Sequence, residues 1–464
     1  MRTRFLNLRV PTGDNATSMR EIVVENGRFV DLIPPEHETA VGDEEWVNFG
    51  GALVLPGAID GHVHFDDPGY THREDFASGT AAAAAGGVTC VVDMPCTSLP
   101  PVTDVAALES KLRAIRGKAH IDFMLWGGAS GITMSSHGWQ DRLTELVEAG
   151  VAAVKIYMLS GMKSFPELDP DQITGLLAQT RRLGIPVGVH AEDATTVRSL
   201  TDRIRKRGAG RTTDYAASRP VAAEVAAVAQ IIEAARAAGA RIHIVHLAAG
   251  EAVDLVSAAR LEGLPVSAET CPHFLEFTVA DLQRLGSLLK TAPVVKSDQD
   301  RDRLWQGIAS HELSFVTTDH APGQWPEEKT TGSIWTDYGG IPGVELMVPY
   351  LFSEGVCKGR ITLERLMQIA ASEPARFFGI DHRKGSIARG FDADFVVLDD
   401  HDTWTVRARN LHTLNRYTPL EGARLTGRVR ATYLRGICVY QRRPDGTEFF
   451  APGGTGSFIK RGLS

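Results

Sequence analysis

The sequence lacks the features that mark membrane and secreted proteins. No apolar run approaches the roughly 18–20 residues that span a bilayer, and residues 1–8 do not lead into the apolar stretch of a signal peptide. Cysteine is scarce, with 5 residues in 464, and none stands in a Cys-x-x-Cys pair. We therefore expect no disulfide framework, no membrane partner and a reducing, cytoplasmic location.

An excess of positive charge is also absent. The formal net charge is −8, from 49 basic and 57 acidic residues, which gives no electrostatic reason to expect nucleic acid as a partner. The composition is otherwise that of a globular protein, with 43% hydrophobic and 23% charged residues. A chain of this length can bury one large core and carry a smaller second domain.

Short β-rich runs alternate with helical stretches between about residues 55 and 380. We expect the β-rich runs at 88–94, 119–126, 151–157, 185–190, 241–247, 265–270, 289–293 or nearby, and 314–319, and helices at 104–116, 171–183, 222–238 and 251–261. Several helical stretches end in glycine, as at Gly184 and Gly239, which is typical of helix C-caps. The alternation predicts a parallel sheet wrapped by helices, either a closed (β/α)8 barrel or an open doubly wound sheet. No Gly-x-Gly-x-x-Gly follows the first strand, which disfavours a dinucleotide-binding sheet.

Both ends of the chain are β-rich. Asn26-Gly27 between apolar runs is a strong hairpin signal, and residues 384–398 and 425–440 alternate apolar and polar side chains with turn residues. We expect the two ends to pair into one small β-sandwich. The predicted domains are residues 1–54 and 381–464 for the sandwich and 55–380 for the helix-wrapped sheet. The glycine-rich tail from Gly453 is expected to be flexible or to pack late.

Polar side chains gather at the predicted ends of several strands. His62 and His64 stand two residues apart, so both imidazoles point to the same face of a strand. An isolated His-x-His is more often structural than metal-binding. Four further residues of this kind occur at or near the ends of other strands, namely Lys155, His190, His246 and Asp319. In a barrel all these ends open on one face, where four imidazoles, a carboxylate and a lysine would suit two metals of the zinc type.

Lys155 is the hardest of these residues to explain as a structural one. It lies within the apolar run Val151-Ala-Ala-Val-Lys-Ile-Tyr157. Because an unpaired buried ammonium costs several kcal/mol, we expect this lysine to be paired, neutral or chemically modified.

With these motifs the chain resembles the cyclic amidohydrolases, the branch of the amidohydrolase superfamily that contains dihydroorotase, allantoinase and hydantoinase. The motifs are Pro56-Gly-Ala-Ile-Asp-Gly-His-Val-His64, Lys155, His190-Ala-Glu-Asp, Ile244-Val-His246, Glu269-Thr-Cys-Pro-His273 and Thr318-Asp-His-Ala-Pro322. The resemblance covers nearly the whole chain. It implies a TIM-like (β/α)8 barrel joined to a β-sandwich, in a homo-oligomer that is a dimer or a tetramer.

The resemblance also implies a binuclear metal centre. Carried over by position, one divalent ion is held by His62, His64 and Asp319 and the other by His190 and His246, with N6-carboxylated Lys155 bridging both. Zinc is the expected metal, although cobalt, manganese and iron fit similar ligands. In this chemistry a metal-bridging hydroxide attacks the ring carbonyl, and Asp319 acts first as general base and then as general acid on the leaving ring nitrogen.

The substrate implied is a small cyclic ureide or imide. Dihydroorotase-like sequences usually carry Arg, Asn and His, which hold the substrate carboxylate, where this chain has Asp66, Cys96 and Gly323. Their loss argues against a substrate whose carboxylate must be bound. We name Asp66, Cys96, Tyr157 and Gly323 as candidate substrate-binding residues. For Asp66 a solvated loop carboxylate is the alternative.

Resemblance to allantoinases is denser than to the other members. It includes residues 67–76, 93–103, 117–123, 126–128 and 215–224, whereas 318–323 is more similar to dihydroorotases and 341–345 to hydantoinases. We therefore expect an allantoinase-like hydrolase that converts allantoin to allantoate. The alternatives are a dihydroorotase, a hydantoinase or dihydropyrimidinase, a deaminase with one metal, and a catalytically silent scaffold relative.

Three further features have two interpretations each. Glu192 and Asp193 either orient metal-bound histidines or are loop carboxylates. His273 is expected to pack under the site rather than to bind metal. Residues 325–338 are expected to form a loop over the pocket that holds substrate or closes as a lid, with a plain surface loop as the alternative.

Overall fold

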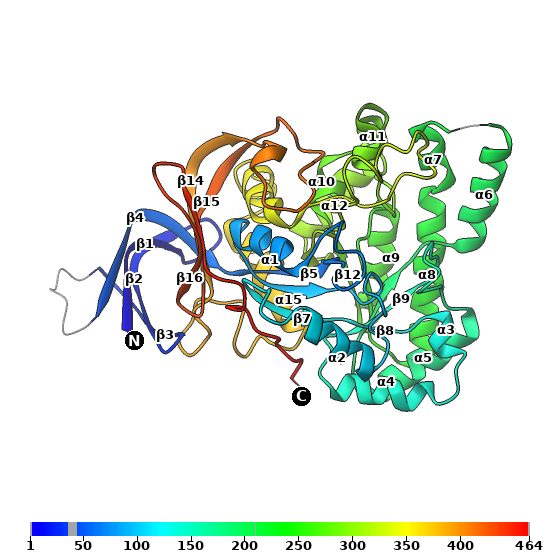
Figure 1. Cartoon of the computed structure of the whole chain (residues 1–464), viewed down its shortest axis with the longest axis horizontal. Helices are drawn as coiled ribbons and strands as arrows, with labels where there is room; N and C mark the ends of the chain where they lie inside the picture. Colours follow the sequence, from blue (N-terminus) through cyan, green and yellow to red (C-terminus); the bar gives the residue numbers. More distant parts are fainter. Residues whose placement is uncertain (1, 36–43, 209, 463–464) are drawn as a thin grey trace.

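Parallel strands close into a barrel at the centre of the molecule (Figure 1). The computed structural model describes residues 2–35, 44–208 and 210–462. The barrel strands are β5 (Ala58–Val63), β6 (Val88–Asp93), β7 (Asp122–Leu125) continued by β8 (Gly127–Gly128), β9 (Val154–Tyr157), β10 (Val187–His190), β11 (Ile242–Ile244), β12 (Val266–Thr270) and β13 (Phe315–Val316). Val63 pairs with His320, and this bridge joins the first strand to the segment after the last.

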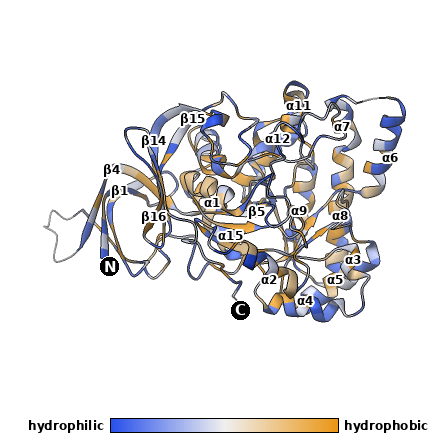
Figure 2. Cartoon of the chain, in the orientation of Figure 1, coloured by the Kyte–Doolittle hydropathy of each residue, from blue (hydrophilic) through white to orange (hydrophobic). Residues whose placement is uncertain are grey.

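Burial on both faces explains why these short runs form barrel strands. Every residue of β6, β9 and β10 is buried. Strands of this kind read as continuous apolar runs, because one face packs into the barrel and the other against helices. The hydrophobic colour of the central strands in Figure 2 follows this arrangement. A polar residue within such a run, as Lys155 is in β9, therefore has no route to solvent from the strand itself.

Helices wrap the outside of the barrel (Figure 1). They are α1 (Phe76–Ala85), α2 (Val105–Ala114), α3 (Gly131–Met134), α4 (Trp139–Glu148), α5 (Pro170–Leu183), α6 (Ala194–Lys206), α7 (Thr212–Ser218), α8 (Val221–Ala238), α9 (Gly250–Leu261), α10 (Pro272–Glu276), α11 (Val279–Leu285), α12 (Asp298–Ala309), α13 (Met347–Tyr350), α14 (Leu363–Met367) and α15 (Glu373–Phe377). Shorter 3-10 turns are η1 (Gly286–Leu289), η2 (Val344–Leu346) and η5 (Ala408–Asn410), and π turns are η3 (Leu351–Val356) and η4 (Gln368–Ser372). Gly184 and Gly239 end α5 and α8 in the left-handed conformation that a C-cap requires.

The two ends of the chain form one mixed eight-stranded sheet beside the barrel. Its strands are β1 (Arg2–Pro11), β2 (Thr17–Glu25), β3 (Arg28–Ile33), β4 (Glu45–Pro56), β14 (Phe395–Thr405), β15 (Arg424–Leu434), β16 (Ile437–Arg442) and β17 (Glu448–Phe450). The join lies between β4 and β14, where Val54 pairs with Val397. Phe5, Phe395 and Tyr433 form part of a separate hydrophobic core. The predicted barrel with a second β-domain built from both termini is confirmed.

One local prediction is wrong, and another is narrowed to one of its two alternatives. Residues 289–293 form no strand; they follow a 3-10 turn and run as a loop that supports the 325–340 segment, with the amide of Gly340 bonded to the Lys290 carbonyl at 2.9 Å. For the tail from Gly453, expected to be flexible or to pack late, the structure shows packing within the described residues: Phe458 pairs with Phe123, and the Ile459 amide donates to the Phe123 carbonyl. The glycines of the tail are needed for this packing rather than for flexibility. Gly456 lies directly against the Ile121 backbone, where a side chain would not fit.

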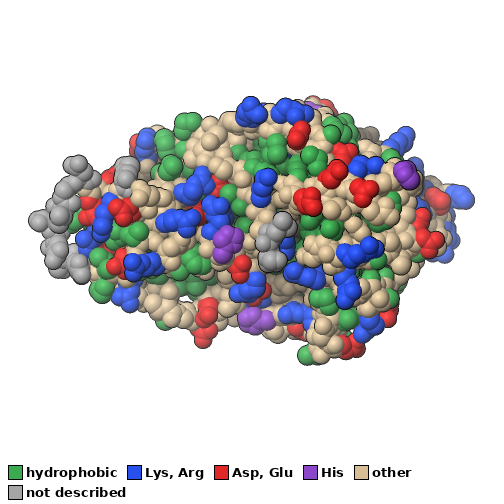
Figure 3. Space-filling model, turned by 90° about the horizontal axis from the view of Figure 1, so that it is seen from below, with side chains coloured by type: hydrophobic (Ala, Val, Ile, Leu, Met, Phe, Trp, Pro, Cys, Tyr) green, Lys and Arg blue, Asp and Glu red, His purple; other side chains and the backbone are tan. Residues whose placement is uncertain are grey.

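The outer surface carries charges of both signs. Figure 3 shows basic and acidic side chains interspersed with hydrophobic ones over one face of the molecule. Across the described ranges, no helix combines the length and the apolar character that crossing a membrane requires.

Candidate metal and substrate site

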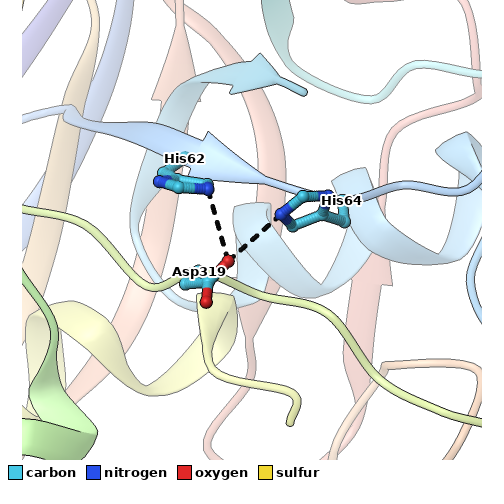
Figure 4. A group of neighbouring side chains, drawn as sticks. All are labelled: His62, His64 and Asp319. Atoms are coloured by element: carbon cyan, nitrogen blue, oxygen red, sulfur yellow. Dashed lines mark hydrogen bonds and ion pairs between the residues drawn. The ribbon is translucent and has the colours of Figure 1, made fainter. Parts of the chain in front are cut away.

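Three of the predicted ligands converge at one end of the barrel (Figure 4). His62 lies in β5 and His64 follows it, and Asp319 follows β13 on the adjacent side of the barrel. The Asp319 Oδ1 atom is 3.3 Å from His62 Nε2 and 3.1 Å from His64 Nε2. One nitrogen or oxygen atom from each residue lies within 4.8 Å of the others, so together they form a candidate metal-binding group.

His190 and His246 lie directly beside this group. His190 ends β10 and His246 follows β11, and His190 Nδ1 is 3.0 Å from His246 Nε2. The ring centroids of His246 and His62 are 5.2 Å apart. The four imidazoles from three different strand ends therefore occupy one continuous site.

Lys155 in β9 lies close enough for its charge to act on His62, His190 and His246. It is fully buried, and within the described part of the chain its Nζ atom has no hydrogen-bond partner. Burial lowers its pKa to about 8, although Cys96 and Asp319 act in the opposite direction. Its positive charge, after burial, is the next cause that lowers the pKa of His62 and of His246. A buried ammonium without a partner is unfavourable beside three imidazoles. The neutral amine or a chemically modified form of Lys155 is therefore favoured.

Three of the four histidines are kept in the neutral form that ligates metal. His64 differs: burial acts to lower its pKa, but Cys96 and the hydrogen bond to Asp319 prevail and raise it to about 10. Burial lowers the pKa values of His62 and His246 well below the ordinary value for histidine. It also lowers that of His190, although the hydrogen bond to Glu192 acts against this. Neutral imidazole offers a free lone pair to a metal, whereas imidazolium does not.

Buried carboxylates orient these rings from behind. Glu269 in β12 is fully buried, and its Oε1 atom is 2.7 Å from His62 Nδ1 and accepts the backbone amide of His246 at 3.3 Å. Its Oε2 atom is 3.1 Å from His243 Nε2. Glu192 accepts from His190 Nε2 at 2.8 Å and also pairs with Arg219. Such carboxylate–histidine pairs fix the tautomer that leaves the other nitrogen free.

Asp60 fixes the backbone at the junction between β5 and β13. Its carboxylate accepts the backbone amides of His62 at 3.2 Å and Thr318 at 3.0 Å, together with the Thr318 hydroxyl. Asp319 has a φ of 47° and His246 a φ of 38°, both in the left-handed region that non-glycine residues rarely adopt. Hydrogen bonds to the backbone therefore hold two metal-ligand candidates, His246 and Asp319, in an energetically unfavourable conformation.

The structure separates the residues that had two interpretations. Glu192 orients His190, whereas Asp193 caps α6 by accepting the Thr196 amide at 2.7 Å. His273 is 5% exposed, and burial lowers its pKa to about 4. It lies outside the ligand group found among the described residues.

A cavity of about 890 Å³ opens above the histidines. Two candidate substrate-binding residues line it, Cys96 and Tyr157, whose Sγ and Oη atoms are 3.2 Å apart. Asp66 is 1% exposed and lies behind the wall, and burial raises the pKa of its carboxyl to about 7. Gly323 is buried as well, and a Cβ atom there would lie 2.8 Å from the Tyr338 ring. Asp66 and Gly323 therefore reach the cavity only through their neighbours.

The 325–338 segment forms a wall of the cavity and is firmly attached. Tyr338 lines the cavity, and its amide donates to the Glu328 carbonyl at 2.7 Å. Buried Lys329 donates to the carbonyls of Tyr338 at 2.9 Å and Gly340 at 2.8 Å. The Trp325 amide bonds Asn415 at 2.8 Å. These contacts describe a fixed wall rather than a loose surface loop.

A second cluster of carboxylates has a different explanation. Asp122, Asp392 and Asp394 lie together in the interior. The ammonium of Lys384 occupies their centre, 2.8 Å from Asp122 and in contact with Asp394. Lys384 offsets the three carboxylates together with Arg383, which pairs with Asp392, and Arg435, which pairs with Asp122, and it joins the barrel to the eight-stranded sheet.

The chain matches the sequence profile described as "Amidohydrolase family" over residues 53–439. The chain belongs to the amidohydrolase family. This amidohydrolase is 40% identical over 405 residues to a protein named allantoinase from Rubrobacter xylanophilus, a match that covers 86% of the chain and 87% of the relative. It is 32% identical over 431 residues to an allantoinase from Escherichia coli, covering 90% and 93%. The predicted family is confirmed.

Solved structures resemble the whole amidohydrolase chain. An L-hydantoinase (dihydropyrimidinase) from Arthrobacter aurescens superposes with a TM-score of 0.92 at 28% identity, covering 99% of both chains. A dihydropyrimidinase from Brevibacillus agri gives a TM-score of 0.91 at 29% identity, again covering 99% of both. The roles of individual site residues stay predictions.

Proposed function

We propose that this amidohydrolase opens the ring of a cyclic ureide, with allantoin as substrate and allantoate as product. The observation that carries the proposal is the cluster of four imidazoles, Asp319 and buried Lys155 at one end of the barrel, in a chain 40% identical to an allantoinase. Hydantoin and dihydropyrimidines are the second candidate, favoured by the overall likeness to hydantoinases.

The residues present fit a pair of divalent metals. His62, His64 and Asp319 would hold one ion, and His190 and His246 the other, with zinc the best match to imidazole and carboxylate ligands. The bound ions would activate water and polarise the ring carbonyl. The unpaired, buried Nζ atom of Lys155 supports its conversion to a bridging carbamate. In that step Nζ forms a bond to the carbon of CO2 and loses a proton.

Asp319 is the residue placed to move the proton. Its side chain lines the cavity and is 13% exposed, while His62 and His64 contact its Oδ1 atom. Its carboxylate would take the proton from the attacking water and return it to the ring nitrogen as the C–N bond breaks. Tyr157 and Cys96, on the same side of the cavity, would contact the bound ring.

The substrate is tested by measuring hydrolysis with protein purified from cells that were grown with zinc and bicarbonate. We expect ring opening of allantoin, weaker opening of hydantoin or dihydrouracil, and little turnover of dihydroorotate, whose carboxylate finds Asp66, Cys96 and Gly323 where related enzymes bind it. Efficient dihydroorotate hydrolysis with no allantoin hydrolysis would refute the proposal.

Lys155→Ala tests the metal centre. We expect loss of activity and of at least one metal ion per chain, because the bridging ligand is removed. In the wild type, ¹³C-bicarbonate should give a carbamate signal that Lys155→Ala lacks. Intact activity in Lys155→Ala would instead favour a deaminase-like centre with one metal, and far less than one ion per wild-type chain would favour a silent scaffold.

The proposal also covers the cellular location and the oligomeric state of the enzyme. Its five cysteines are all free, which supports a reducing cytoplasm. Assembly as a dimer or a tetramer is proposed from the family resemblance, and the mass of the protein in solution tests it.

A further inference from the structure

One wall of the cavity holds a clamped arginine that the proposed reaction has not used. Arg73 lines the cavity next to the rings of Tyr70 and Tyr338, with its Cζ atom 4.7 Å and 4.3 Å from the two centroids. Its Nε and Nη2 atoms bind the two carboxylate oxygens of Glu328 at 2.8 Å and 2.6 Å. Both aromatic faces and the fork are therefore fixed before any substrate arrives.

The guanidinium retains unused donors. It carries five N–H groups, of which Glu328 takes two. Among the described residues, Arg73 makes no further side-chain hydrogen bond that accounts for the remaining ones. Because the guanidinium is planar, these remaining N–H groups point outward from its edge, in the same plane as the two that bind Glu328.

The residues that depart from the dihydroorotase pattern surround this arginine. Gly323 leaves room for the Tyr338 ring, which a side chain at 323 would displace. That ring in turn stacks on Arg73. Asp66 lies close enough for its charge to act on both His64 and Arg73. The altered positions thus build one polar subsite beside the metal-ligand candidates.

The charge balance of the subsite selects a neutral partner. Glu328 already neutralises Arg73, and the Asp66 carboxyl lies behind it. A carboxylate on the substrate would have to share the one guanidinium with the carboxylate of Glu328. A urea carbonyl is a strong neutral acceptor and needs no excess positive charge.

We propose that Arg73, clamped by Tyr70, Tyr338 and Glu328, is a specificity-determining residue that donates to the carbonyl oxygen of the exocyclic ureido group of the substrate. This inference rests on the proposed function and deepens it, because it assigns recognition of the ureido tail to a site separate from the metals. The ring itself would be bound by the metal centre, and the tail would lie against the free edge of the Arg73 guanidinium.

Comparing allantoin with hydantoin, which has the same ring without the ureido group, tests the proposal. For Arg73→Gln we expect kcat/KM on allantoin to fall about ten- to a hundredfold, mainly through KM, as for loss of a hydrogen bond to a charged group. The value for hydantoin, measured as a substrate or as a competitive inhibitor, should change less than about threefold. Arg73→Lys should recover little, because an ammonium cannot reproduce the clamped fork.

Two further variants keep the test decisive. Glu328→Gln removes the clamp but leaves the guanidinium, and should lower the allantoin-to-hydantoin ratio less than Arg73→Gln does. Arg113→Gln removes an exposed guanidinium on α2 and should leave the ratio unchanged. Should Arg73→Gln fail to fold, Arg73→Lys and Glu328→Gln carry the test.

The outcomes separate the two proposals. Wild-type turnover of allantoin with equal losses on both compounds in the Arg73 variants, or with no loss, overturns the role of Arg73 alone. A metal-loaded wild type that opens neither ring overturns the proposed function and this inference with it. If wild type hydrolyses dihydroorotate faster than Arg73→Gln does, and the two proteins do not differ on allantoin, Arg73 recognises a carboxylate. That result would also refute the ureido assignment.

Discussion

One buried side chain, Glu269, holds two of the candidate ligands at once. It orients the His62 ring through one oxygen and the backbone of His246 through the same atom, while its other oxygen binds His243. His243 in turn bonds Ser267 at 2.8 Å and stacks on Phe315. The carboxylate therefore has no freedom to rotate, and neither does the His62 ring.

Glu269→Gln should weaken metal binding with little change in fold. The amide can still accept through its oxygen but cannot satisfy both histidines as the carboxylate does, so we expect about a 10–100-fold loss of metal affinity. Metal content after dialysis against graded chelator measures this directly. Glu148→Gln, an exposed change on α4, should retain wild-type metal content. Equal retention in both variants would show that Glu269 serves only packing.

The sequence predicts the ligand candidates and one residue that orients them, Glu192, but it assigns no such role to Glu269 or Glu328. His62, His64 and Asp319 follow apolar runs, and that local pattern predicts where side chains point. Glu269 acts on His62 across 207 positions of sequence, and Glu328 acts on Arg73 across 255. No spacing rule links such pairs, because the barrel closure alone brings them together. Two signals for Glu269 were available: a glutamate inside a predicted buried strand, and its place in the motif Glu269-Thr-Cys-Pro-His273.

At the scale of elements, the 325–338 segment shows how a loop is made rigid without regular structure. The sequence predicts a loop over the pocket that holds substrate or closes as a lid, with a plain surface loop as the alternative. The stability of the segment comes from Lys329 and from the Arg73–Glu328 pair, which bond carbonyls and side chains rather than a backbone ladder. Lid motion would have to break several of these bonds together.

Lys329→Met should make the 325–338 segment more mobile. The substitution keeps the length and apolar stem of the side chain but leaves the carbonyls of Tyr338 and Gly340 without their ammonium donor, at a cost of about 1–3 kcal/mol per buried group. We expect faster amide hydrogen exchange across residues 326–340 and a raised KM, because Tyr338 no longer holds Arg73. Lys206→Met, exposed on α6, serves as the matched control and should change neither quantity. Rapid exchange already present in wild type would instead support a mobile lid.

The arrangement of neighbouring strands explains why residues 289–293 do not form the predicted strand. Its short apolar run is compatible with a strand, and the alternating pattern around it favours one. The barrel, however, is already closed by β12, β13 and β5, so no edge is left for another strand to pair with. The segment instead supplies Lys290, whose carbonyl and side chain bind the 337–340 stretch.

At the scale of the whole molecule, the sheet from the chain ends is tied to the barrel by buried and half-buried ion pairs. Lys384 and the three carboxylates around it form one such tie. His412 forms another: its Nδ1 atom is 3.0 Å from Glu345 on η2, and its Nε2 atom is 3.1 Å from Glu448 on β17. The predicted union of the two termini is confirmed, whereas the exact division at residues 54 and 380 stays a prediction.

The His412 tie makes the attachment pH-dependent in a defined direction. Burial acts to lower the pKa of His412, but its hydrogen bonds to Glu345 and Glu448 prevail and raise it to about 10 from an unfolded value of 6.5. The folded protein thus binds the proton more tightly than the unfolded chain. The stabilisation is fully present below pH 6.5 and is lost as the pH rises through 10.

The difference in unfolding free energy between wild type and His412→Gln isolates this contribution from other titrating groups. At pH 6 we expect wild type to be more stable by about 1–3 kcal/mol, because glutamine keeps hydrogen bonding but loses the positive charge between two carboxylates. By pH 10 to 11 the difference should shrink toward zero. Denaturant unfolding at pH 6, 8 and 10 measures it, with His401→Gln, whose side chain is 91% exposed, as the control that should show no such trend. A difference that grows with pH would mean that His412 is neutral in the folded state and that the two glutamates hold the sheet by other contacts.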